Sequence, residues 1–393
     1  MLCEEVGQFV TSTRTPAPND PGRPEQCSTR IVFFIAGVAV AAWAPLVPFA
    51  KARAGLNHGA LGLLLLCLGV GSIVAMPLAG ALAARFGCRR AVVGSTALIC
   101  VALPLLATVS SVPLLVVSLF AFGAGLGSVD CVMNIQAVSV ERASRRPMMS
   151  GFHGLFSVGG IIGAAGVSGL LSVGASPLVA MLCVAAGIVG ALIKAAPHLL
   201  PYGGEQAGPA FAIPHGIVLF IGILCFIMFL AEGAVLDWSA IFLTATRGVV
   251  ASNGGLGYAT FALTMTVGRL TDDVIVRQLG GALVVAIGSL CAAAGLVLAA
   301  IFPSWVAGIV GFALVGVGCS NIVPVLYTAV GRQKVMPEHT AIPAITTLGY
   351  AGILAGPAAI GFVAQISSLS TAFLAVGLLL IGVAASWRVL RVQ

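Results

Sequence analysis

Three acidic residues lie inside long apolar stretches of the 393-residue sequence: Asp130, Glu232 and Asp237. An ionised carboxylate at the centre of a bilayer costs about 2.5–3.5 kcal/mol on insertion scales, so such residues are rare and typically functional. Burial disfavours the charged form of a carboxylate. The group can then bind a proton near neutral pH and release it when water reaches it, which is the chemistry that a proton-coupled carrier needs.

Asp130 is the strongest candidate for a proton site. It lies about ten residues, roughly 15 Å of helix rise, from the inner end of its apolar stretch. Asn134 follows one helical turn later on the same face, and counting from the turn near Ser144 places His153 at nearly the same depth. We expect Asp130 to take the proton and Asn134 and His153 to connect it with the solute. His153 titrates near neutral pH and is expected to share the proton. The alternative for these residues is a helix–helix hydrogen bond without a role in turnover.

Further polar and aromatic residues lie in the apolar stretches. Glu232 lies at the depth expected of a central cavity, so we interpret it as a second proton or solute contact, whereas Asp237 approaches the outer end of the same stretch. Trp43 and Trp238 are typical of interface anchors near outer helix ends, and the alternative is a pair of aromatic faces that bind solute. Uncharged groups expected to contact solute hydroxyls are Asn321, Tyr327 and Gln365.

The composition predicts where these residues lie. Charged side chains make up 8% of the chain, against about 25% in soluble domains. Hydrophobic residues reach 59%, and the mean hydropathy is +1.12. A soluble fold cannot bury so much apolar surface, which excludes a cytosolic enzyme, a disordered chain and a disulfide scaffold. The composition is typical of an all-α polytopic membrane protein.

The sequence offers little support for chemistry other than transport. It contains no HExxH, GxSxG or Walker motif and no CxxC pair among its 10 cysteines, so we expect no enzyme activity, no cofactor and no metal site. The net charge of +7 does not indicate nucleic acid, because the basic residues lie mainly in the loops that flank the apolar stretches.

Twelve apolar stretches indicate twelve transmembrane helices. They cover approximately 31–50, 56–84, 91–109, 113–140, 148–172, 175–196, 214–244, 253–271, 279–301, 305–330, 340–366 and 369–388. The widest polar connection divides them into two halves of six. We expect a flexible cytoplasmic tail over 1–30, six-helix bundles over 31–196 and 214–390, and a cytoplasmic linker over 197–213.

The distribution of Lys and Arg predicts the orientation. With the N-terminus inside, sixteen of the 19 basic residues fall on inner segments, and Lys51, Arg53 and Arg247 fall on outer loops. Arg269 counts among the sixteen, at the inner end of its stretch. Because basic residues collect in cytoplasmic loops, both termini are expected in the cytoplasm.

The two halves repeat each other at an offset of about 190 residues. The matching residues are Trp43 with Trp238, Gly125-Leu-Gly with Gly316-Val-Gly, and Gly80-Ala-Leu with Gly268-Arg-Leu. The match places Asp130 opposite Asn321. Halves of six spans in the same orientation indicate a parallel repeat, and such transporters bind solute near the midplane between the halves.

A segment rich in glycine and arginine joins the second and third stretches: Gly80-Ala-Leu-Ala-Ala84-Arg85-Phe-Gly87-Cys-Arg89-Arg90. It resembles the signature of the major facilitator superfamily, Gly-x-Leu-x-Asp-Arg-x-Gly-Arg-Lys/Arg, with Ala84 in place of the acid. The second half keeps the acid at Asp272. The resemblance implies twelve helices in two pseudo-symmetric six-helix bundles. It also implies a gating role for Gly80, Arg85, Gly87, Arg89, Arg90, Gly268 and Asp272.

Within the superfamily, the chain resembles the fucose–proton symporter branch and its uncharacterised bacterial relatives of the YbjJ type. The resemblance rests on Gly125-Leu-Gly-Ser-Val-Asp130-Cys-Val-Met-Asn134 and on Ser150-Gly-Phe-His153-Gly-Leu-Phe-Ser157. In the symporters the acid matching Asp130 is the proton site, and an Asn stands where this chain has His153. Drug–proton antiporters carry an Arg in the fourth span and a Gly-Pro motif in the fifth, and this chain departs from both.

These observations predict a secondary transporter of the bacterial cytoplasmic (inner) membrane that works as a monomer by alternating access. Its expected partners are the lipid bilayer, protons and a small polar solute, sugar-like by resemblance, that is imported by proton symport. The alternative is proton-driven efflux of a small organic compound.

Overall fold

The computed structural model describes residues 21–56, 58–203, 213–249 and 256–391, and these ranges are built from helices and their connections. The helices of the first half are α1 (Arg23–Ala42), α2 (Val47–Ala54), α3 (His58–Thr108), α4 (Val112–Ser144), α5 (Met149–Ser172) and α6 (Pro177–Ala195). Those of the second half are α7 (Gly216–Ile241), α8 (Leu256–Leu279), α9 (Gly281–Ile301), α10 (Trp305–Cys319), α11 (Ile322–Arg332), α12 (Glu338–Ile366), α13 (Leu369–Ala385) and α14 (Trp387–Arg391).

The expected twelve membrane crossings are present. Ten segments within the described ranges are long and apolar enough to cross a membrane, and α10 and α11 together form one of them. Helix α3 crosses twice, because Gly87 adopts φ 85° and joins two helices within its 51 residues. Helix α8 supplies the remaining crossing, and its lower hydropathy reflects Arg269 and the acids near its end. The protein is therefore a multi-pass, all-α membrane protein.

The first helix begins earlier than the sequence indicated. Pro24 suits the first turn of a helix, and the Glu25 carboxylate accepts a hydrogen bond from the Gly22 backbone N–H at 2.6 Å, so α1 starts at Arg23. The expected tail over 1–30 is thus wrong for its last eight residues, which are helical, and its first 20 residues lie outside the described ranges. Part of the expected linker, 204–212, also lies outside them.

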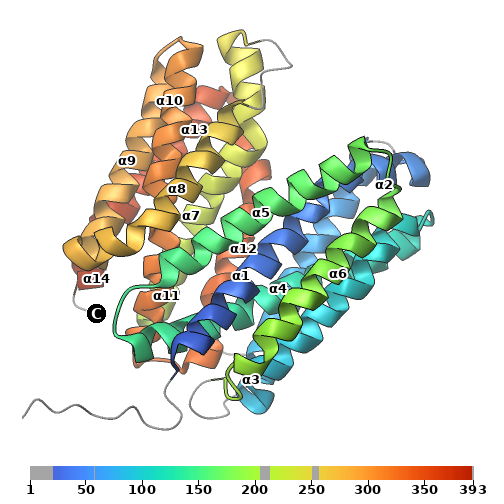
Figure 1. The fold of residues 1–393 in the computed structure, drawn as a ribbon. Coiled ribbons are helices and arrows are strands. Elements are labelled where there is room, and N and C mark those ends of the chain that lie inside the picture. Colours follow the sequence, from blue (N-terminus) through green and yellow to red (C-terminus); the bar gives the residue numbers. More distant parts are fainter. Residues whose placement is uncertain (1–20, 57, 204–212, 250–255, 392–393) are drawn as a thin grey trace, which may run out of the picture.

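The same helix pairings occur in both halves. Helix α1 packs against α5 and α6 just as α7 packs against α12 and α13, and α3 packs on α4 just as α8 packs on α10. Between the halves, α3 packs on α12 and α5 packs on α8. Figure 1 shows the two bundles leaning together at the end where α1 begins and α14 ends, and diverging toward the other end. We name the first of these the terminal end and the second the opposite end.

Candidate functional site

Asp130 on α4 faces the second half of the molecule. The hydroxyls of Tyr350 on α12 and Tyr327 on α11 lie close enough to its carboxylate to interact with it electrostatically. Counted from Ser144, the last residue of α4, Asp130 is roughly 21 Å along the helix. No described basic side chain lies within ion-pair distance of this carboxylate. The charge of Asp130 is therefore not compensated by a described cation.

Asn134 lies one turn from Asp130, as its spacing predicts. Its Nδ2 donates to the backbone oxygen of Asp130 at 2.8 Å and lies 3.5 Å from the carboxylate Oδ1. The amide Oδ1 of Asn134 is buried without a hydrogen-bond partner. An unused acceptor therefore lies next to the acid.

His153 on α5 lies among aromatic rings from both halves. Its ring centroid is 5.0 Å from that of Phe33 on α1 and 5.8 Å from that of Tyr327. The Nδ1 atom lies 3.0 Å from the backbone oxygen of Met149, which fixes the ring. The hydroxyl of Tyr327 lies 2.7 Å from that of Thr346 on α12. His153 and Tyr327 are thus brought together, and Tyr327 also lies near enough to Asp130 to interact with it electrostatically.

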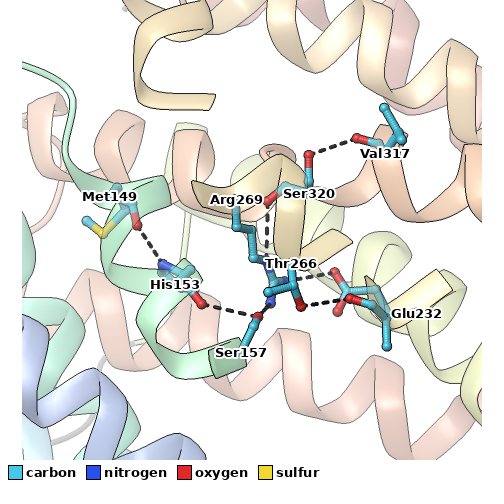
Figure 2. Close-up of polar contacts among 9 residues, drawn as sticks. Met149, His153, Ser157, Glu232, Thr266, Arg269, Val317 and Ser320 are labelled. Carbon is cyan, nitrogen blue, oxygen red and sulfur yellow. Dashed lines mark hydrogen bonds and ion pairs between the residues drawn. The ribbon is translucent and has the colours of Figure 1, made fainter. Parts of the chain in front are cut away.

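The sequence places Arg269 at the inner end of its helix, and this prediction is wrong. The structure buries Arg269 within α8 instead of at an inner helix end. Its Nη1 donates to the Ser157 hydroxyl on α5 at 3.1 Å, and its Nε donates to the Ser320 backbone oxygen at 3.3 Å. Its Nη2 lies 3.8 Å from Oε1 of Glu232 on α7. Figure 2 shows this cluster, with the guanidinium of Arg269 between Ser157 and Glu232.

Other predicted solute contacts lie apart from these two clusters. Gln365 is exposed in the last turn of α12, roughly 22 Å along that helix from Tyr350. Trp43 is buried after α1, and Trp238 packs against Gly361 in its own half. Both indole N–H groups are buried without a hydrogen-bond partner.

Asn321 takes part in closing the terminal end. Its Oδ1 accepts a hydrogen bond from the Ser150 hydroxyl in the other half, and its Nδ2 has no hydrogen-bond partner. It lies where the tenth crossing is broken between α10 and α11.

Two neighbouring residues of α4 complete this closure. Glu141 accepts from the backbone N–H groups of Met148 and Met149 at 2.7 and 2.8 Å, and from the Thr328 hydroxyl of the second half. Arg142 pairs with Glu338 and donates to the Gly331 backbone oxygen. These polar contacts between the halves lie closer to the terminal end than Asp130 and Arg269 do.

Two motif residues of the first half, Gly80 and Arg89, make structural contacts with other helices or connections. A Cβ on Gly80 would overlap Pro343 of α12, so this glycine allows the halves to approach closely. Arg89 donates through Nε to the Ala196 backbone oxygen and through its backbone N–H to Leu200 at 2.9 Å. The turn between the crossings is thereby fixed to the chain that follows α6.

The remaining motif residues have fewer contacts. Arg85 stacks over Phe86 at 5.1 Å, and Arg90 is exposed. Gly268 is partly buried on α8 beside Arg269, and the side chain of Asp272 lies outside the described part of the structure.

The chemistry that these clusters offer is binding and proton transfer. Within the described ranges, no three His, Cys, Asp or Glu side chains gather as a metal would require. Carboxylates, amides, phenols and a guanidinium line the boundary between two helical bundles, which contact each other near the terminal end. Such an arrangement defines a secondary transporter.

The chain belongs to the major facilitator superfamily, whose model matches residues 31–340. It is 57% identical over 369 residues to an uncharacterised MFS-type transporter of Yersinia pestis, covering 94% of this chain and 96% of that protein. It is 32% identical over 347 residues to the membrane protein MosC of Rhizobium meliloti, covering 87% and 84%. The protein is therefore an MFS transporter and not an enzyme.

Solved structures support the same fold. An outward conformation of the transporter FucP superposes with a TM-score of 0.78 at 16% identity, covering 94% of this chain and 99% of that one. A variant of the Escherichia coli fucose:proton symporter FucP gives a TM-score of 0.76 at 17% identity, covering 93% and 98%.

Proposed function

We propose that this protein is a proton-coupled symporter of a small polar solute in the bacterial cytoplasmic membrane, with both termini in the cytoplasm and Asp130 as the proton carrier. The observation that carries the proposal is the environment of Asp130. It is an acid at membrane depth that faces the second half, lies near the hydroxyl of Tyr350 and has no described cation partner. A proton is the simplest charge compensation for such a group.

In the proposed cycle, contacts between the two halves close one end of the protein at a time. With the termini inside, the terminal end is cytoplasmic, and the contacts of Glu141, Asn321 and Gly80 close it. Proton and solute then reach Asp130 and its neighbours from the opposite end. Protonation removes the charge that otherwise opposes closure around the carboxylate. The halves rock, the cytoplasmic contacts separate, and the proton and solute leave to the inside.

The solute is expected to be sugar-like. The unused acceptor Asn134 Oδ1 lies next to the acid, and further unused donors on the boundary or in the first half are Asn321 Nδ2 and the indole N–H of Trp43. Hydroxyl-rich solutes satisfy both donors and acceptors. The fold shared with a fucose:proton symporter supports this choice.

Uptake by proteoliposomes tests the proposal. The wild type is expected to accumulate a solute from a panel of neutral sugars when an inward proton gradient is imposed. Asp130→Asn is expected to lose this accumulation but to keep exchange of solute across the membrane. Asp237→Asn is the matched control, because Asp237 is an exposed acid near the opposite end. Accumulation by the Asp130 variant at the wild-type level would contradict the proposal.

A further inference from the structure

Arg269 joins the two halves at a place that the proton site does not use. The guanidinium belongs to α8, and it reaches Ser157 on α5 at 3.1 Å and the backbone of Ser320 at 3.3 Å. Its third contact is Glu232 on α7, in its own half. A charged side chain in the membrane interior is costly and is kept mainly for function.

The pair formed by Arg269 and Glu232 is incomplete. Their closest atoms are 3.8 Å apart, longer than an N–H···O hydrogen bond. The two side chains are 9% and 14% exposed, and Oε1 of Glu232 has no hydrogen-bond partner. A buried carboxylate oxygen without a donor is unfavourable, so the cluster has the capacity to bind one more hydrogen-bonding group.

We propose that Arg269 and Glu232 form a solute subsite that takes a neutral hydroxyl group between the guanidinium and the carboxylate. A hydroxyl accepts from an N–H of Arg269 and donates to Oε1 of Glu232, so a single group satisfies the hydrogen-bonding capacity of both side chains. The inference rests on the proposed function, because it assumes that this protein carries a solute.

The charges of the subsite select against ionised solutes. A carboxylate on the solute is attracted by Arg269 but repelled by Glu232, and an ammonium group experiences the reverse, so neither ion gains a net attraction that offsets its lost hydration. The pair has no net charge, so a neutral group enters without a counter-ion. Neutral sugars and polyols therefore fit better than their acidic or amino analogues.

Binding at this subsite also affects contact between the halves. The Arg269 N–H that bonds Ser157 lies at the α5–α8 contact, where Gly154 packs against Leu270. A solute hydroxyl that accepts from Nη2 binds the same guanidinium whose Nη1 donates to Ser157. Solute binding therefore acts on a group that joins the two halves.

Equilibrium binding without any gradient tests the subsite. The full-length protein in nanodiscs is titrated with aldohexoses, each paired with its uronic acid and its amino analogue. The wild type is expected to prefer the neutral member by about tenfold or more. Glu232→Gln is expected to shift the preference toward the uronic acid, and Arg269→Gln toward the amino analogue. Ser157→Ala, the control, is expected to keep the neutral preference.

A structural role would lower all affinities alike and would not change their order. The same order of preference in the wild type and both glutamine variants overturns the proposal, as does a wild type that binds no neutral member. Arg269→Lys and Glu232→Asp keep the charges if the glutamine variants fail to fold. Each is expected to lose affinity by about tenfold with the order retained, and unchanged affinity in both overturns the proposal.

The two proposals can fail separately. Loss of proton coupling at Asp130 leaves the charge preference of the subsite standing. A wild type that accumulates solute with a proton gradient but does not distinguish neutral from ionised analogues retains the proposed function and refutes the subsite.

Discussion

The carboxylate of Glu141 on α4 accepts a hydrogen bond from the hydroxyl of Thr328 on α11, and so joins the two halves at the terminal end. The same carboxylate accepts from the first backbone N–H groups of α5. A negative charge at a helix N-terminus is stabilising. One buried acid thus anchors a helix within its own half and a contact between the halves.

We expect Glu141→Ala to destabilise the protein by about 3 kcal/mol, because it removes several hydrogen bonds to a charged group and leaves backbone donors unpaired. Thr328→Val removes only the bond between the halves and is expected to cost about 1 kcal/mol. The free energy of unfolding in detergent, measured by denaturant titration, checks both values. Equal losses in the two variants would contradict the double role of Glu141.

Gly80 offers a test of the close approach between the halves. A valine there would overlap Pro343 and the backbone of His339, so Gly80→Val is expected to push the terminal end open. A spin-label pair at Ala143→Cys and Lys334→Cys, exposed positions in opposite halves, reports the change as a longer distance. Gly94→Val is the control, because a Cβ at Gly94 meets open space. An unchanged distance in the Gly80 variant would show that this contact does not limit closure.

Much of the fold follows from the sequence, because apolar length and the positions of Gly and Pro mark each crossing. Helices α5 and α6 begin within two residues of their predicted starts. Gly87 turns the chain where the motif implied a turn. The break between α10 and α11 at Asn321 was not predicted, because its surroundings are apolar on both sides.

The candidate site was predictable only within one helix. The spacing of Asp130 and Asn134 places both on one face of α4, and the structure shows their contact. Tyr350 and Thr328 were missed, because the partners of Asp130 and Glu141 in the second half are far away in sequence. Arg269 was assigned to a helix end, because it lies in a polar segment and its burial depends on packing between α5, α7 and α8. The sequence did contain a signal for this burial, because Arg269 is a single basic residue within an apolar run that ends before Asp272.

The orientation of the termini is a separate prediction. Lys334→Cys at the terminal end is expected to be protected from a membrane-impermeant maleimide in intact cells. Val173→Cys, 81% exposed in the turn after α5 at the opposite end, is expected to react. The reason is the excess of Lys and Arg at the terminal end. The reverse labelling pattern would place the termini outside and reverse the assigned direction of closure.

Proton movement coupled to solute entry is the most direct test of the role of Asp130. Proteoliposomes that contain a pH-sensitive dye receive the neutral sugar that the wild type transports fastest, with no proton gradient at the start. The account predicts that the lumen acidifies as the sugar enters through the wild type, and that sugar enters through Asp130→Asn without acidification. Acidification through the variant equal to that of the wild type, at the same rate of sugar entry, would contradict it.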